Sequence, residues 1–232
     1  MVCNRDERIA RTPALSPAWQ TTGVRSMLAP IDTEGGGTWI GVNDAGIVAV
    51  LLNRSISLQR PGMRTRGDIV PRLLAADTLQ RLVEGARGID PFAFNPFRAV
   101  ALHGRGLVIA ASDGARLTID TWMLDAARMF TSSSLGDDEA ERRRAPLFAT
   151  LVERARDPLR GQRAFHDHRW RACPAFSVRM ARGDARTVSR SVIDLRSDRV
   201  TFTYEPLVDD PDPTFHIPNR KPHVDSGCAI WR

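Results

Sequence analysis

Four consecutive polar residues, Asn4-Arg5-Asp6-Glu7, form the densest group of reactive side chains in the sequence, and Cys3 precedes them. An arginine and a carboxylate at the end of a strand can orient a substrate or stabilise a nearby nucleophile. The same four residues are also typical of a helix start or of a surface ion pair. The tetrad alone therefore leaves a catalytic and a structural interpretation open.

Two further stretches have the composition of a binding site. Gly35–Trp39, which includes Gly37 and Thr38, can bring backbone amide groups close to a ligand because glycine permits close approach. Asn53 and Arg54 end a strongly apolar segment, where Asn53 can donate a hydrogen bond to a developing oxyanion. Each stretch also has a structural interpretation, as a loop that leads into a hairpin and as a polar strand end.

Other catalytic and metal-binding patterns have little support. His166-Asp167-His168 and Cys173 are metal-ligating residue types, but the stretch is rich in arginine and lacks a fourth ligand at a suitable spacing. Ser132-Ser133-Ser134 lacks the G-x-S-x-G turn of serine hydrolases and has no evident base. The sequence therefore predicts no metal site, no cofactor and no serine nucleophile.

The charge pattern does not favour nucleic-acid binding, although the net charge is +6 and the pI is about 10.4. Lys221 is the only lysine, and the arginines are scattered along the chain. Such a bias is typical of GC-rich coding sequence, whereas a phosphate-binding surface needs clustered charge. We expect a small-molecule substrate or ligand and no nucleic-acid partner, and nothing in the sequence selects an oligomeric state.

The sequence has no signal of export or of membrane insertion. It contains no run of eighteen apolar residues, and its start lacks a cationic segment followed by an apolar one. The three cysteines, Cys3, Cys173 and Cys228, are widely spaced and odd in number, which favours reduced thiols. We therefore expect a cytoplasmic protein without a membrane span.

The periodicity of apolar residues predicts an α+β fold rather than alternating β-α units. A hairpin is expected at Trp39–Val42 and Ile47–Leu52, around a turn that places glycine at Gly46. The residues from 205 to 232 contain five prolines, so the predicted organisation is a domain over 1–204 and a Pro-rich extension over 205–232. Further helices are expected within 66–88 and 137–157, and further strands within 97–112, 116–122, 127–133, 175–182, 186–195 and 199–207.

Taken together, the motifs resemble the NRDE family, whose eukaryotic members are called transport and Golgi organisation proteins. The resemblance rests on the ordered motifs "NRDE" at 4–7, "GGTWIGVNDAGIVAVLLNR" at 36–54 and "TRGDIV" at 65–70. It continues more loosely through "IDPFAFNPFRAVAL", "FTSSSL" and "DARTVSRSVIDL". It therefore covers most of the chain except the Pro-rich extension.

The resemblance implies an N-terminal-nucleophile hydrolase-like fold, a four-layer αββα sandwich of two mostly antiparallel sheets. It also implies hydrolysis of a C–N amide bond in an unknown small metabolite, with an N-terminal cysteine as nucleophile and its own α-amine as base. The residues that it implies are Asn4, Arg5, Asp6 and Asn53 for catalysis, and Gly37, Thr38, Trp39 and Arg54 for substrate binding.

The start of the sequence departs from the pattern of the family. Family members begin Met-Cys and run through one strand and a turn before a second strand ends in NRDE. Here Met1 stands three residues before Asn4, and removal of Met1 exposes Val2 rather than Cys3. We expect that the first strand and its nucleophile are missing from this chain, that the chain as given is inactive, and that an in-frame Met-Cys lies roughly fifteen to twenty codons upstream.

The resemblance also leaves a second class of function open. Eukaryotic relatives have been linked to lipid homeostasis and haem trafficking, so a non-catalytic carrier of lipid or haem is the alternative. Aromatic residues make up only 6% of the chain, and Cys173-Pro174 is its only Cys-Pro pair. That dipeptide is also typical of a turn before a strand.

Overall fold

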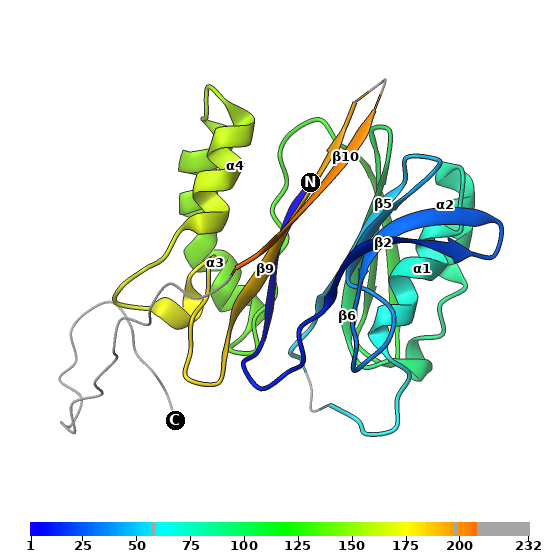
Figure 1. Cartoon of the computed structure of the whole chain (residues 1–232), viewed down its shortest axis with the longest axis horizontal. Helices are drawn as coiled ribbons and strands as arrows, with labels where there is room; N and C mark the ends of the chain where they lie inside the picture. Colours follow the sequence, from blue (N-terminus) through cyan, green and yellow to red (C-terminus); the bar gives the residue numbers. More distant parts are fainter. Residues whose placement is uncertain (57–58, 197–198, 208–232) are drawn as a thin grey trace.

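Two antiparallel sheets stack face to face between two layers of helices (Figure 1). The computed structural model describes residues 1–56, 59–196 and 199–207. One sheet has three strands in the order β1-β9-β10, and the other has seven in the order β2-β3-β4-β5-β6-β7-β8. The strands of the first sheet are β1 Val2–Arg8, β9 Ala185–Leu195 and β10 Val200–Pro206. Those of the second are β2 Leu15–Thr22, β3 Arg25–Ile31, β4 Ile40–Asn43, β5 Val48–Asn53, β6 Phe97–His103, β7 Gly106–Ser112 and β8 Leu117–Met123.

The helices cover the two outer faces of the stacked sheets (Figure 1). α1 and α2 lie against the seven-stranded sheet, while α3 and α4 lie beyond the three-stranded sheet. The predicted α+β architecture of two antiparallel sheets between helical layers is thus confirmed. None of the helices in the described ranges is long and apolar enough to cross a membrane. The helices are α1 Ile69–Leu74, α2 Leu79–Arg87, α3 Asp137–Phe148 and α4 Pro158–Asp167, with a 3-10 turn at Arg66–Asp68 and a π-helical turn at Ala149–Glu153.

β5 lies in the middle of the seven-stranded sheet and is apolar on both faces, as its sequence predicts. Val48 and Val50 pack in the cluster between the two sheets, together with Ile193 of β9. Ala49 belongs to the separate cluster that α1 and α2 form with the sheet, which includes Leu73. Successive side chains of a strand point to opposite faces, so this one strand helps to build both cores.

Asn43 fixes the hairpin between β4 and β5. Its Oδ1 accepts hydrogen bonds from the backbone N–H groups of Ala45 and Ile47, and its Nδ2 donates to the carbonyls of Leu74 and Ala76. The same side chain therefore closes the turn and satisfies carbonyls at the C-terminal end of α1, which otherwise have no partner. Gly46 adopts a φ of 76° in this turn, in agreement with the expectation from the sequence.

β1 carries the Asn4–Glu7 tetrad at an edge of the three-stranded sheet. It pairs with β9 on one side, and no strand of the described ranges pairs with its other side. A β-bulge interrupts the register, because Arg5 lies opposite Ser189 while Asp6 lies opposite Thr187. Bulges of this kind re-aim side chains next to functional sites.

Several local predictions are wrong. Residues 127–133 form no strand and instead run along the space between the layers, and residues 175–182 form a 3-10 turn and a single bridge rather than a strand. The hairpin of β2 and β3 and the helix α4 were not anticipated.

The predicted domain boundary falls inside a strand, because β10 continues to Pro206. Residues 197–198, between two of the predicted strands, and residues 208–232 of the Pro-rich extension lie outside the described residues.

Gly37 sits where two loops touch, and this contact generates a prediction for stability. Its φ is 69°, and a Cβ added to it would lie 2.4 Å from the carbonyl oxygen of Gly67. Gly36 has a φ of 66° but has nothing within 4 Å of such an atom. We expect Gly36→Ala to cost about 1 kcal/mol through backbone strain alone, and Gly37→Ala to cost about 1–3 kcal/mol more through overpacking. Urea unfolding of both variants measures the difference, and equal losses would contradict the contact.

Candidate functional site

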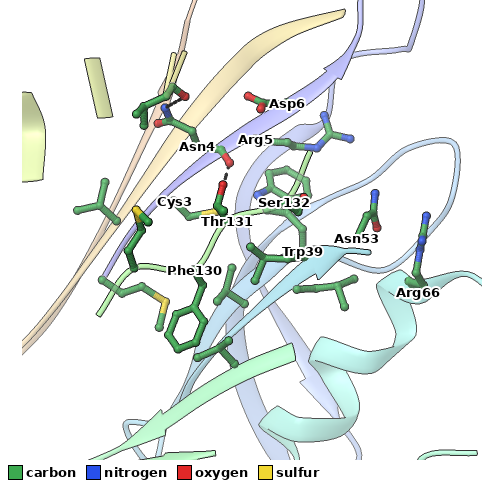
Figure 2. A pocket seen from close by; sticks show the side chains of 18 of the residues that line it. Cys3, Asn4, Arg5, Asp6, Trp39, Asn53, Arg66, Phe130, Thr131 and Ser132 are labelled. Carbon is green, nitrogen blue, oxygen red and sulfur yellow. Dashed lines mark hydrogen bonds between the residues drawn. The ribbon is translucent and has the colours of Figure 1, made fainter. Parts of the chain in front are cut away.

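A cavity of about 1730 Å³ opens between the two sheets and is lined by residues of β1, of the Thr38-Trp39 segment and of the end of β5 (Figure 2). The loop over 124–134 and the loop before α1 complete its wall. Of the eight residues that the resemblance implies for catalysis and substrate binding, the structure places six in this wall: Asn4, Arg5, Asp6, Thr38, Trp39 and Asn53.

Arg5 reaches from the three-stranded sheet to the seven-stranded sheet. Its guanidinium carbon lies 4.3 Å from the centroid of the Trp39 ring, and its Nη2 lies 3.3 Å from Glu7 Oε2 and 3.7 Å from Asp32 Oδ2. Arg11 binds the same Asp32 carboxylate through its Nη2, at 3.0 and 2.8 Å. The Arg5 side chain is only 8% exposed, so this stacking and these carboxylates compensate the desolvation of its charge.

Asp6 lines the cavity, so its side chain is accessible to solvent inside the cavity. The protein around the cavity still separates the carboxyl from bulk water. This enclosure raises the pKa of the Asp6 carboxyl, because it disfavours the charged form. A hydrogen bond of 2.6 Å from Thr187 Oγ1 and the positive charges of Arg144 and Arg182 act in the opposite direction. The carboxyl is thus held in a fixed position at the site.

Asn4 points away from Arg5 and connects β1 to the helical layer. Its Nδ2 donates to the carbonyl oxygens of His166 at 2.8 Å and Val178 at 3.0 Å. These bonds join β1 to the C-terminal end of α4 and to the segment that precedes β9. The contacts are those of a residue that positions the strand.

Cys3 is a free thiol that is half-buried in the cavity wall. Desolvation, reinforced by the nearby Asp6 carboxylate, raises the pKa of the Cys3 thiol to about 12. Such a thiol is protonated at neutral pH and is a poor nucleophile. Cys173 is disulfide-bonded, so the expectation of reduced thiols is wrong at that position.

Trp39 has a side-chain donor without an acceptor among the described residues, whereas Thr38 and Gly37 are held in place by contacts with neighbouring residues. The indole Nε1 of Trp39 is buried and has no acceptor among the described residues. Thr38 is buried, with its backbone N–H bonded to the carbonyl of Gly67 and its hydroxyl to the carbonyl of Ile40. Gly37 packs against Gly67 and does not line the cavity.

The other two predicted residues, Asn53 and Arg54, lie at the end of β5, and only Asn53 lines the cavity. Asn53 is exposed and lines the cavity, whereas Arg54 does not line it. The backbone N–H of Arg54 donates to the carbonyl of Pro96, which holds the strand end beside β6. The roles predicted for Asn53, Gly37 and Arg54 therefore remain predictions, with only Asn53 in contact with the cavity.

Part of the cavity wall is an irregular loop where a strand was predicted, and its Phe130, Thr131 and Ser132 line the cavity (Figure 2). Buried Arg144 of α3, which no motif singled out, donates to Thr131 Oγ1. A signal for Arg144 exists in the sequence, because Ala140, Arg144 and Phe148 follow one another at helical spacing and are all buried. Because Arg144 is the last of three consecutive arginines, this row of buried positions is hard to recognise in the sequence.

The histidine-rich stretch at the end of α4 contributes structure at the cavity. His166 lines the cavity, and its buried Nδ1 has no partner among the described residues. Asp167 binds Arg190 of β9 at 2.6 Å instead of forming part of a metal site. In the described ranges no three His, Cys, Asp or Glu side chains are grouped so that they could hold a metal ion.

Comparisons with known proteins agree with the motifs. A sequence model of the family described as Transport and Golgi organisation 2 matches residues 1–123. The Transport and Golgi organization 2 homolog of Mus musculus is 32% identical over 80 residues, which are 33% of this chain and 28% of the mouse protein. The match thus spans less than a third of that relative. The structure of penicillin V acylase from Agrobacterium tumefaciens aligns with a TM-score of 0.48 and 14% identity, over 88% of this chain and 73% of that chain.

The imidazole of His166 generates a prediction for acid stability. Desolvation by the surrounding protein, together with the charge of Arg190, lowers the pKa of His166 from 6.5 to about 3. The unfolded chain therefore binds a proton below about pH 6.5 that the folded chain does not bind until about pH 3, so stability falls as the pH falls through this window. Between pH 7 and pH 5 this difference amounts to about 2 kcal/mol.

Urea unfolding at the two pH values checks this expectation. His166→Gln should lose less stability between pH 7 and pH 5 than the parent chain, by about 2 kcal/mol. His103→Gln, on β6 and outside the cavity wall, is the matched control and should keep the parent dependence. If His166→Gln keeps the pH dependence of the parent chain, burial does not lower the pKa of His166 and the prediction is wrong.

Proposed function

The chain belongs to the Transport and Golgi organisation 2 family, and we propose that the cavity between its sheets is an amidohydrolase-type site for a C–N bond of a small metabolite. One observation supports this function most strongly. Arg5 and Asp6 from one sheet meet Trp39 and Asn53 from the other around a single cavity. Two motifs that lie more than thirty residues apart in the sequence thus contribute to one wall.

The groups around the cavity suit acyl transfer. In such a reaction a thiolate forms a bond to the amide carbon, the C–N bond breaks as the amine takes a proton, and water then releases the acid from the thioester. The oxyanion that forms needs fixed hydrogen-bond donors. Trp39 Nε1 and the Asn53 carboxamide are two donors in the wall, and Arg5 supplies a fixed positive charge beside them.

Cys3 does not serve as the nucleophile in this proposal. With a pKa of about 12, the thiolate fraction at pH 7 is on the order of 10⁻⁵. Its Sγ is instead 3.4 Å from the carbonyl oxygen of Asn4, to which it can donate. The proposed role of this chain's residues is therefore to bind and orient the amide.

The size of the cavity favours a second candidate, a non-catalytic carrier of lipid or haem. A volume of about 1730 Å³ exceeds the roughly 300–1,000 Å³ of ordinary ligand pockets. Part of its inner wall is apolar and includes Val100, Leu102, Leu107 and Phe130. Cys173 does not serve as a haem ligand in this reading, because a disulfide-bonded sulfur offers no thiolate.

An amide-hydrolysis assay on the chain and on Cys3→Ala tests the role of Cys3. We expect neither protein to release amine from a panel of N-acyl amides above the buffer rate, because the Cys3 thiol is protonated. Sustained turnover that disappears in Cys3→Ala would overturn this assignment. A haem titration distinguishes the carrier, since a Soret shift lost in His166→Gln would favour that function over amide hydrolysis.

A further inference from the structure

The arginines of the cavity wall differ in how their charges are compensated. Most have a carboxylate oxygen within 4 Å. Arg144 is compensated in another way, because its guanidinium donates to Thr131 Oγ1 and to the carbonyls of Phe176 and Ser177. The arginines with a carboxylate are Arg5, Arg11, Arg64, Arg128 and Arg182.

Arg66 lacks this compensation. It is half-buried, yet no carboxylate among residues 1–56, 59–196 and 199–207 lies within ion-pair distance of it. Within these residues its side chain makes one hydrogen bond, from Nη1 to the carbonyl of Pro96 at 3.0 Å, and Nε and Nη2 have no acceptor there. Burial lowers the pKa of the Arg66 guanidinium, because nothing offsets its loss of hydration.

The backbone holds Arg66 in place before any ligand arrives. Arg66 begins a 3-10 turn whose N-cap, Thr65, accepts a hydrogen bond from the N–H of Gly67. The carbonyl of Gly67 in turn accepts the N–H of Thr38 at 3.1 Å, which fastens the turn to the loop before β4. A guanidinium fixed at both its backbone and its Nη1 loses little freedom when it binds an anion.

Asn53 lies next to this guanidinium. The Pro96 carbonyl accepts both Arg66 Nη1 and the backbone N–H of Arg54, so Arg66 is anchored at the strand end that carries Asn53. In Figure 2 the two side chains extend in the same direction, on the side of Trp39 away from Cys3. A guanidinium and a carboxamide at the same strand end place N–H donors for two groups of a ligand in one part of the wall.

We propose that the free Nε and Nη2 donors of Arg66 bind a carboxylate of the ligand at the polar end of the cavity, while Asn53 beside it donates to the amide carbonyl and the apolar inner wall holds a hydrocarbon portion. This inference rests on the proposed function, because it places an amide bond between the two ends. The ligand class is therefore an N-acyl amino acid or a similar amide that carries a single carboxylate. Charge-assisted hydrogen bonds of this kind are about twice as strong as neutral ones.

Calorimetric titration of the full chain with N-octanoylglycine and with its neutral analogue, N-octanoylglycinamide, tests the inference. We expect the acid to bind at least about tenfold more tightly than the neutral analogue. Arg66→Gln should remove this preference, while Arg66→Lys should keep part of it. Arg81→Gln is the matched control, because Arg81 lies on α2 outside the cavity wall, is exposed and is paired with Asp77; it should keep the preference unchanged.

Two results would overturn the inference: equal affinity of the parent chain for both compounds, or an undiminished preference in Arg66→Gln. Circular dichroism of each variant confirms that it is folded. Binding is measured without turnover, so the subsite and the proposed reaction fail separately. Because this chain is expected to cleave no amide, turnover plays no part in testing the subsite. Equal binding of the acid and the neutral amide would overturn only the subsite, whereas turnover that disappears in Cys3→Ala would overturn only the assignment of Cys3.

Discussion

The stacking of Arg5 on Trp39 is the interaction on which the site depends. A guanidinium that is 8% exposed must find compensation inside the protein, and here an aromatic face and two carboxylates provide it. Glu7 belongs to the same strand as Arg5, but Trp39 and Asp32 flank strands of the other sheet. The charge therefore connects the two sheets at the cavity and sets the distance between its walls.

The two sequence motifs divide their residues between construction and chemistry. In the tetrad, Asn4 ties β1 to the helical layer, whereas Arg5 and Asp6 face the cavity. In the glycine-rich motif, Gly37 allows the close approach of two loops and Trp39 forms the wall. Each motif therefore contains residues that line the cavity and other residues that hold them in position.

Much of the fold follows from local physical rules that a sequence reveals. The β4–β5 hairpin was predictable because two apolar runs around a glycine with positive φ leave a clear pattern. The start of α4 was also predictable from the sequence, because Asp157 and Pro158 are a typical helix start. In the structure Asp157 Oδ1 accepts the N–H groups of Leu159 and Arg160. The arginines that follow obscured its apolar stripe.

The rest of the site could not be predicted, because it depends on contacts between distant segments. The loop at 130–134 has no regular secondary structure, and its place in the wall is set by Arg144 from α3. Arg66 combines partial burial with the absence of a neighbouring carboxylate within the described part of the chain, a combination that no local pattern encodes. Charge compensation is a property of the folded arrangement.

A double-mutant cycle between Arg5→Ala and Trp39→Leu, measured by urea unfolding, tests the central interaction most directly. If the guanidinium stacks on the indole between the sheets, the two losses of stability will be non-additive by about 1–2 kcal/mol. Additivity within about 0.3–0.5 kcal/mol would show that the two side chains do not interact, and would contradict the shared cavity wall on which the proposed site rests.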